Sequence, residues 1–305
     1  MRIEDTDRER STPENVEQIL DALRWLELDW DEGPVSQAER ADAHEKRLRE
    51  LLDSGKAYYD TATADDVKAY KAAHDNAGYR GEPAEEGAEG AAIRLRVPDE
   101  GATVVDDVIR GEIRFENRVL DDSVIARDDG SVLYNFAVAV DDLEMGITDV
   151  IRGDDHLSNT PKQLLAIKAL GGEPPRYAHL PLLHGPDGKK LSKRHGAASV
   201  QELRDAGYLP AAIRNYTALL GWGTTDDTTL MSTEELVRRF RLEDVGRASA
   251  IFDEQKLRWI NGRFMREMPL DEYTAAVAEF VGREPDEALC AACAIVQEKA
   301  QTLAE

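Results

Sequence analysis

In its middle third the sequence alternates strand-like and helix-like segments, and this alternation restricts the fold more than any other feature. The nearly continuous apolar run 132–140 predicts a strand buried on both faces. Residues 147–151 predict a second, short strand. Thr160 as a cap and Pro161 at the first helical position predict a helix, and residues 177–183 predict a further strand. This strand–helix–strand order predicts a parallel sheet with helices packed on it.

Outside this alternation the sequence predicts helices at both ends and short strands between them. The strands form a hairpin-rich block that looks like an insertion. The predicted helices are 13–26, 36–53 and, within a mainly helical stretch from 196 onward, 286–303; the predicted strands are 93–97, 103–109 and 112–120.

The charge balance and the cysteine content exclude some classes of protein. Acidic residues number 61 against 38 basic ones, a net charge of −23, which argues against a protein that coats nucleic acid through bulk electrostatics. An enzyme whose basic residues lie on one face is compatible with this charge. Two cysteines, no long apolar run and a charged beginning favour a soluble cytoplasmic protein.

Two polar segments of the middle region are candidates for ligand binding. Residues 187–196 hold four cations within six residues on a glycine-flanked loop, which suits phosphate; a solvated basic loop is the alternative. Arg152 lies just past the end of a predicted strand, where open α/β sheets bind ligands, and its guanidinium suits a carboxylate. The alternative is an arginine that pairs with Asp154 or Asp155 and only ties down the strand end.

The third candidate segment is the acidic cluster at the start of the chain. Glu4, Asp5 and Asp7 precede the first predicted helix, where acids commonly complement the helix dipole. The same carboxylates suit an ammonium group, and the residues alone leave both interpretations open.

The order of these three segments resembles the bacterial-type glutamyl-tRNA synthetases, which are class I aminoacyl-tRNA synthetases. R-I-E-D-T-D stands near the start, V-I-R-G-D-D-H midway and K-L-S-K-R-H-G after it. Further segments that read like the family are 159–163, 207–210, 220–222 and 252–261. The resemblance covers nearly the whole chain.

The resemblance implies an α/β fold. A Rossmann-type class I catalytic domain is split by an inserted α+β connective domain and followed by a mainly helical stem-contact domain. The implied boundaries are 1–57 and 132–186 for the two parts of the Rossmann domain, 58–131 for the inserted acceptor-binding domain, 187–268 for the signature loop and stem-contact domain, and 269–305 for the start of a helical anticodon-binding region.

The resemblance also implies an activity. The family activates L-glutamate with ATP and Mg²⁺ to glutamyl-adenylate, then transfers the glutamyl group to the 3′ end of tRNA-Glu. For the amino acid it implies Glu4 at the α-ammonium and Tyr134 and Val138 in the pocket. It implies Arg152 at the side-chain carboxylate.

For ATP, the resemblance implies residues before the signature loop and within it. They are Asp155, His156, Leu183, Lys190, Leu191, Ser192, Lys193 and Arg194. Lys190 and Lys193 are the implied catalytic residues, because their ammonium groups stabilise charge at the reacting α-phosphate. Asp155 is a shorter acid than the glutamate often seen in relatives.

Two features depart from the family pattern. The family opens with a strand, a P-S-P-T-G loop and an H-I-G-H-like helix start, and we expect this ATP-binding unit to be missing before Arg2 through a truncated start. We expect this loss to impair the activity of the chain. The last helical pattern reaches Glu305 without a stop signal, so we expect a truncated end as well.

Some relatives carry zinc in the inserted domain, but the only cysteines, Cys290 and Cys293, fall short of the four ligands that zinc needs. We therefore expect no zinc and no other protein-bound metal.

Two other functions stay open on the sequence. A paralogue similar to glutamyl-queuosine tRNA-Asp synthetase is one, and the stem-contact resemblance of residues 252–261 argues against it. A non-catalytic tRNA-binding remnant is the other, and the retained Glu4, Arg152 and signature loop argue against that. The expected partners are tRNA-Glu, L-glutamate and ATP, with no membrane, and the expected state is a monomer.

Overall fold

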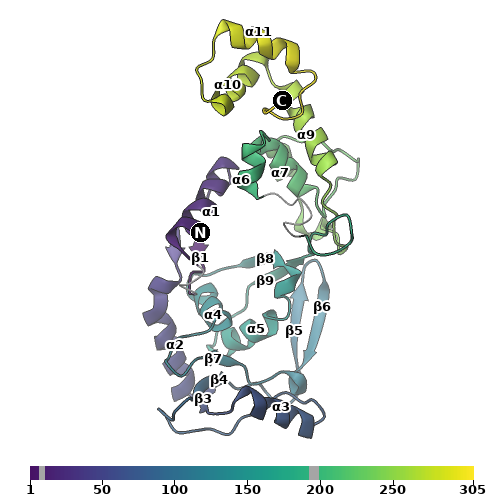
Figure 1. Cartoon of the computed structure of the whole chain (residues 1–305). Helices are drawn as coiled ribbons and strands as arrows, with labels where there is room; N and C mark the ends of the chain where they lie inside the picture. Colours follow the sequence, from purple (N-terminus) through teal and green to yellow (C-terminus); the bar gives the residue numbers. More distant parts are fainter. Residues whose placement is uncertain (7–10, 192–198) are drawn as a thin grey trace. The chain divides into compact units, whose positions relative to one another are not determined.

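The computed structural model describes residues 1–6, 11–191 and 199–305, which fall into two compact units (Figure 1). Unit 1 comprises Met1–Thr12 and Asp31–Leu180, and unit 2 comprises Pro13–Trp30 and Pro181–Glu305. The first helix of the chain therefore belongs with the C-terminal half. No described helix is long and apolar enough to span a membrane.

Unit 1 combines helices with three sheets. Its helical elements are η1 (Ala38–Arg40), α2 (Ala41–Asp53), α3 (Ala64–Ala73), η2 (Asn117–Val119), α4 (Tyr134–Glu144), η3 (Asp154–His156) and α5 (Thr160–Ala169). Its strands are β1 (Arg2–Ile3), β2 (Val35–Ser36), β3 (Ala57–Asp60), β4 (Ala92–Leu95), β5 (Ala102–Asp107), β6 (Gly111–Glu116), β7 (Val124–Ala126), β8 (Asp149–Gly153) and β9 (Arg176–Leu180).

The largest sheet has the order β6-β5-β9-β8 (Figure 1). Strands β8 and β9 are parallel, which confirms the predicted pairing of these two segments. The sheet as a whole is mixed, because the antiparallel hairpin β5–β6 of the predicted insertion joins it where Asp107 pairs with Tyr177. The smaller sheet β3-β4-β7 is antiparallel, and β1 pairs in parallel with β2.

The apolar run 132–140 lies mostly in the helix α4, so the predicted strand is wrong. A short apolar run indicates burial on all sides, and helices and strands both meet that pattern. Helix α4 packs against α2, α5 and β7, and Phe136, Ala139 and Val140 are at most 1% exposed. A helix can be enclosed in this way because its backbone groups bond to one another.

Two further predicted helices have different bounds. The helix expected over 36–53 begins only at Ala41, because the backbone of Val35–Ser36 pairs with β1. The helix expected over 286–303 ends at Val296. After it, the Gln297 side chain donates to the carbonyl of Met265 at 2.9 Å. This hydrogen bond holds the residues that follow Val296 against the helix that contains Met265.

The core of unit 1 lies on both sides of α5. On one side, Leu51, Leu95, Phe136 and Ile167 fill the space between the helices and the smaller sheet. On the other side, Leu164 packs between β5 and β9. This packing places the first turn of α5 next to the carboxyl ends of β8 and β9.

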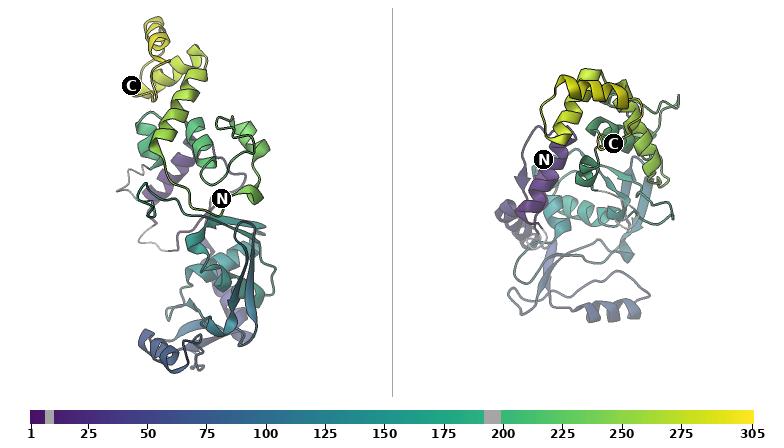
Figure 2. Two further views of the ribbon diagram at one scale, coloured as in Figure 1. Left: turned by 90° about the vertical axis from the view of Figure 1, so that its right-hand side faces the viewer. Right: turned by 45° about the horizontal axis from the view of Figure 1, so that its top comes forward.

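Unit 2 is helical in its described part. Its elements are α1 (Pro13–Trp25), α6 (Val200–Asp205), α7 (Pro210–Ala218), α8 (Thr233–Arg239), η5 (Leu242–Asp244), α9 (Glu254–Glu267), α10 (Leu270–Val281) and α11 (Glu287–Val296). The helix starts predicted at Pro210, Asp253 and Pro269 are confirmed. Helices α10 and α11 pack against each other (Figure 2).

Ile167 tests the proposed core of unit 1. It is fully buried, so Ile167→Ala should lower the free energy of unfolding by about 2–5 kcal/mol through lost burial and a residual cavity. The matched control is Val119→Ala, since Val119 is 48% exposed, and it should change the value by about 0.5 kcal/mol or less. Urea titration followed by far-ultraviolet circular dichroism measures both, since all four tryptophans, Trp25, Trp30, Trp222 and Trp259, lie in unit 2. Equal losses for the two variants would contradict the core assignment.

Candidate functional site

Arg152 lies at the carboxyl end of β8, directly opposite His179 in the parallel strand β9. Its half-buried guanidinium donates to uncharged groups. Nε donates to Nε2 of His179 at 3.2 Å, and Nη2 donates to Oγ1 of Thr160 at 2.9 Å and to Oε1 of Gln163 at 2.8 Å. The ring centre of Tyr177 lies 5.5 Å from Cζ. Arg152 therefore keeps a positive charge that no carboxylate among the described residues pairs.

The strand-end pairing considered for Arg152 with Asp154 does not occur. Asp154 forms an ion pair with Arg110 instead. The ion pair of Asp154 with Arg110 thus fixes the end of β8 and leaves the charge of Arg152 unneutralised.

Thr160 and Gln163 are site residues that the sequence pattern revealed only as a helix start. Both are fully buried, and their separation of three residues places them on one face of α5. The Gln163 amide also donates to Oδ1 of Asn135 at 3.1 Å, which turns its carbonyl oxygen toward Arg152.

His179 and Asp107 form a buried pair behind Arg152. Nδ1 of His179 lies 2.6 Å from Oδ2 of Asp107, and both side chains are fully buried. The sequence placed each residue in a predicted strand but offered no sign of their contact. Polar residues inside two predicted buried strands are a signal that could have found them, because a buried polar group requires a partner.

Glu4, Tyr134 and Arg152 share one electrostatic environment. Burial raises the pKa of Tyr134, the Glu4 carboxylate raises it further, and the Arg152 charge opposes both. Val138 follows Tyr134 by one turn of α4 and is 3% exposed. Three of the four residues implied for the amino acid thus lie within electrostatic reach of one another, and Val138 is buried in α4.

Two acids of the cluster at the start of the chain, Glu4 and Asp5, are held by unit 1, and Asp7 lies outside the described residues. Arg2 pairs with the buried Asp142 at 2.8 Å and with Glu4 at 3.0 Å. Asp5 accepts from Oγ of Ser36 at 2.7 Å. These contacts, and not the start of a helix, fix the position of Glu4.

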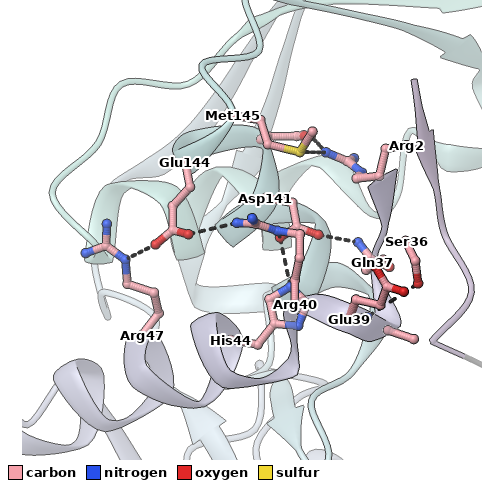
Figure 3. A network of polar contacts seen from close by, with 12 residues as sticks. Arg2, Ser36, Gln37, Glu39, Arg40, His44, Arg47, Asp141, Glu144 and Met145 are labelled. Atoms are coloured by element: carbon pink, nitrogen blue, oxygen red, sulfur yellow. Dashed lines mark hydrogen bonds and ion pairs between the residues drawn. The ribbon is translucent and has the colours of Figure 1, made fainter. Parts of the chain in front are cut away.

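A buried carboxylate on α4 supports this arrangement (Figure 3). Asp141 accepts hydrogen bonds from Gln37 at 2.8 Å and Arg40 at 2.6 Å, and Nε2 of His44 lies 2.8 Å away. Arg40 also pairs with Glu144 one turn along the helix at 2.8 Å. The network joins the segment that follows β2 to the helix that begins with Tyr134.

The residues implied for ATP are divided between the units. Asp155 and His156 belong to η3 in unit 1, where the ring centres of His156 and Tyr134 are 6.1 Å apart. Leu183 belongs to unit 2.

The signature loop begins in unit 2. The amide of Leu191 donates to the carbonyl of Leu183 at 2.8 Å. The backbones of Lys190 and His184 pair in an isolated antiparallel β-bridge. The remaining implied residues, Ser192, Lys193 and Arg194, lie outside the described residues.

A cleft of about 1730 Å³ opens in unit 1 between α2, α4 and the smaller sheet. Its lining includes Thr6, Tyr134 and Asn135, but neither Glu4 nor Arg152. Within the described ranges, no cluster of three or more His, Cys, Asp or Glu side chains is placed to hold a metal ion.

Comparison with known families identifies one match over most of the chain. Residues 1–259 match the family described as tRNA synthetases class I (E and Q), catalytic domain. A glutamate–tRNA ligase of Halorhodospira halophila is 47% identical, over all of this chain and 68% of the relative. A glutamate–tRNA ligase of Caldanaerobacter subterraneus is 45% identical, over 93% of this chain and 62% of the relative.

A solved structure has the same fold. It is a glutamate tRNA ligase from Elizabethkingia meningosepticum in complex with its amino acid, with a TM-score of 0.85 and 29% identity. The match covers 99% of this chain and 70% of that chain. Across these relatives, the chain spans between 62% and 70% of their length.

The Asp141 network predicts a loss of stability in acid. Burial opposes ionisation of Asp141, but hydrogen bonds from His44, Arg40 and Gln37 outweigh it and lower the pKa of Asp141. A lowered folded-state pKa stabilises the protein above the unfolded value of about 3.9, and this contribution disappears as the pH falls through the folded-state pKa. Asp141→Asn should therefore remove part of the stability gained between acid and neutral pH.

At pH 7, Asp141→Asn should lower the free energy of unfolding by about 3 kcal/mol, because Arg40 loses its buried counter-charge. The exposed Asp128→Asn is the control and should change it by about 0.5 kcal/mol or less. Urea titrations from pH 7 to pH 3 measure both. A variant with the same acid dependence as the parent chain would remove Asp141 from this role.

Proposed function

Since the chain belongs to the class I tRNA synthetases for glutamate and glutamine, and within them to the glutamate–tRNA ligases, we propose that its site activates L-glutamate with ATP. The product is glutamyl-adenylate, and the glutamyl group then passes to the 3′ end of tRNA-Glu. Membership of the family rests on the match over residues 1–259 and on the 47% identical relative.

The charge of Arg152 is the observation that carries this proposal. A half-buried guanidinium held by a histidine nitrogen, a hydroxyl and an amide oxygen has lost water without gaining a counter-ion. Such a cation favours an anionic ligand, and its planar fork suits a carboxylate. We assign it to the side-chain carboxylate of glutamate. Glutamine, which is neutral there, would leave the charge unpaired.

The other end of the amino acid requires an anionic partner. Glu4 supplies a carboxylate for the α-ammonium group, and Tyr134 lies in the same electrostatic environment. Val138 contributes apolar volume beneath them. The solved relative in complex with its amino acid supports a glutamate site in this fold.

ATP binding is proposed from the resemblance and from charge. Asp155, His156 and Leu183 are assigned to the nucleotide. Lys190, Leu191, Ser192, Lys193 and Arg194 are assigned to the loop over the phosphates. Lys190 and Lys193 are the proposed catalytic residues, because ammonium groups offset the charge that develops at the α-phosphate. Mg²⁺ enters with ATP as part of the substrate and needs few protein ligands.

The remaining expectations stay proposals. They are the absence of zinc, the monomeric state, the cytoplasmic location and the five domain ranges given above. No observation on the described residues favours the queuosine-type paralogue or a non-catalytic remnant over glutamate–tRNA ligation.

Glutamate-dependent exchange between ATP and labelled pyrophosphate tests the activity. The assay is run on the 305-residue chain and on a version extended upstream of Met1 by the strand, loop and helix start of the family. With tRNA-Glu present, we expect exchange with L-glutamate to far exceed exchange with L-glutamine, and to be stronger in the extended version. Omitting tRNA-Glu shows whether the first step needs it. No exchange under any of these conditions would remove glutamate activation from this chain and make tRNA binding the function to measure.

Arg152→Ala tests the amino-acid site. Loss of the partner of a buried substrate charge should cost at least about 2 kcal/mol, which raises the KM for glutamate about 30-fold. The control is Arg114→Ala, because Arg114 is exposed on β6 and pairs only with Glu116 among the partners seen. Glutamate KM values from the exchange assay compare the two. An unchanged KM in Arg152→Ala would exclude this role.

A further inference from the structure

The orientation of Arg152 depends on the protonation of one imidazole. The side chain of an arginine can only donate, so Nε2 of His179, 3.2 Å from Nε of Arg152, must present a lone pair. The proton of the neutral ring then lies on Nδ1, which faces Asp107 at 2.6 Å. Oγ1 of Thr160 lies 3.0 Å from the same Nε2, and its rotatable hydroxyl can donate or accept there. Of the two neutral tautomers, only this one satisfies both Arg152 and Asp107.

The hydrogen bonds of Asp107 fix that tautomer. Its Oδ1 accepts from the amides of Ile109 at 3.0 Å and Arg110 at 2.8 Å, which leaves Oδ2 for the imidazole. Burial opposes ionisation, but these hydrogen bonds lower the pKa of Asp107 and keep it an acceptor. A buried carboxylate with all its oxygens engaged has little freedom to move.

The charged and titratable groups around His179 agree with a neutral ring. Burial lowers the pKa of His179, Asp107 on β5 raises it, and Arg152 on β8 lowers it; Asp154 on η3 acts from further away. Tyr177 stacks on the ring at 6.1 Å between centres. From α5, two uncharged side chains face the pair of His179 and Arg152: Thr160 contacts His179, and Gln163 contacts Arg152.

We infer that His179, held in its Nδ1-protonated form by Asp107, is the positioning residue that aims Arg152 at the substrate carboxylate. Asp107 then controls glutamate affinity without touching the substrate. The inference rests on the proposed function, because it assigns the ligand of Arg152 to glutamate. It adds a strand of the inserted block, β5, to the residues that determine amino-acid recognition.

Asp107→Asn is the decisive variant. The backbone amides keep the asparagine oxygen at the Oδ1 position, so the amide nitrogen faces Nδ1 and forces the proton of His179 onto Nε2. Two donors then face each other at Arg152. Calorimetric titration with L-glutamate should show an affinity about 10- to 100-fold lower, the range for a lost hydrogen bond to a charged group.

The control is Asp122→Asn, which changes another buried carboxylate of unit 1. Asp122 is 1% exposed and accepts from Tyr58 at 2.9 Å and Val97 at 2.7 Å, away from Arg152. It should leave glutamate affinity unchanged. If Asp122→Asn lowers the affinity as much as Asp107→Asn, the loss reflects general destabilisation and the inference is wrong.

A double-variant cycle tests the route through the imidazole. In His179→Gln, the side-chain oxygen can accept from Arg152 whatever the charge at position 107. Asp107→Asn should therefore lower glutamate affinity in the parent chain and change it little in the His179→Gln background. Equal losses in both backgrounds would show that Asp107 acts by another route.

Nitrogen-15 spectra of histidine-labelled protein report the tautomer without any substrate. The His179 signals, assigned by their loss in His179→Gln, should show Nδ1 protonated in the parent chain and Nε2 protonated in Asp107→Asn. Nε2 protonation in the parent chain overturns the inference. A parent chain that binds no glutamate, but has the expected tautomer, contradicts the proposed function and leaves the positioning of Arg152 intact.

Discussion

Asp141 is fully buried in unit 1, and the arrangement of the candidate site depends on its hydrogen bonds. Its carboxylate joins α4 to the segment after β2 through Gln37, Arg40 and His44. The next residue of α4, Asp142, pairs with Arg2, which in turn contacts Glu4. A buried carboxylate costs several kcal/mol unless it is paired. Helix α4 therefore cannot rotate or shift without a large loss, and the positions of its first residue and of the N-terminal strand are set together.

Unlike the carboxylates of Asp141 and Asp142, the guanidinium of Arg152 has no ion-pair partner among the described residues. Within the same unit, Arg94 pairs with Asp60 and so has an internal counter-ion. Arg152 instead faces a hydroxyl, an amide oxygen and an imidazole nitrogen, which orient the guanidinium but do not neutralise it. The free protein holds a partly desolvated charge, and an anionic ligand would relieve that cost. This difference between two arginines in one unit is the basis for proposing Arg152, and not Arg94, as a binding group.

The hairpin β5–β6 gives the inserted block a direct part in the site. Strand β5 joins the sheet beside β9, and its last residue, Asp107, contacts His179. A carboxylate that the chain order assigns to an insertion thus lies two hydrogen bonds from the guanidinium of Arg152. The block is structurally continuous with the sheet that carries Arg152, and changes in β5 can reach the guanidinium through a single imidazole.

The family, the helix starts at Pro210, Asp253 and Pro269, and the position of Arg152 at a strand end could all be predicted from the sequence. These depend on local signals, namely caps, prolines and the order of short motifs. It did not determine that residues 132–140 lie mostly in a helix, because an apolar run reports burial and not backbone geometry. Nor could it reveal the neutral acceptors around Arg152. Asp107 and His179 are 72 residues apart, and only the packing of β5 beside β9 brings them together. Contacts of that kind follow from strand order and register, which the tertiary structure decides.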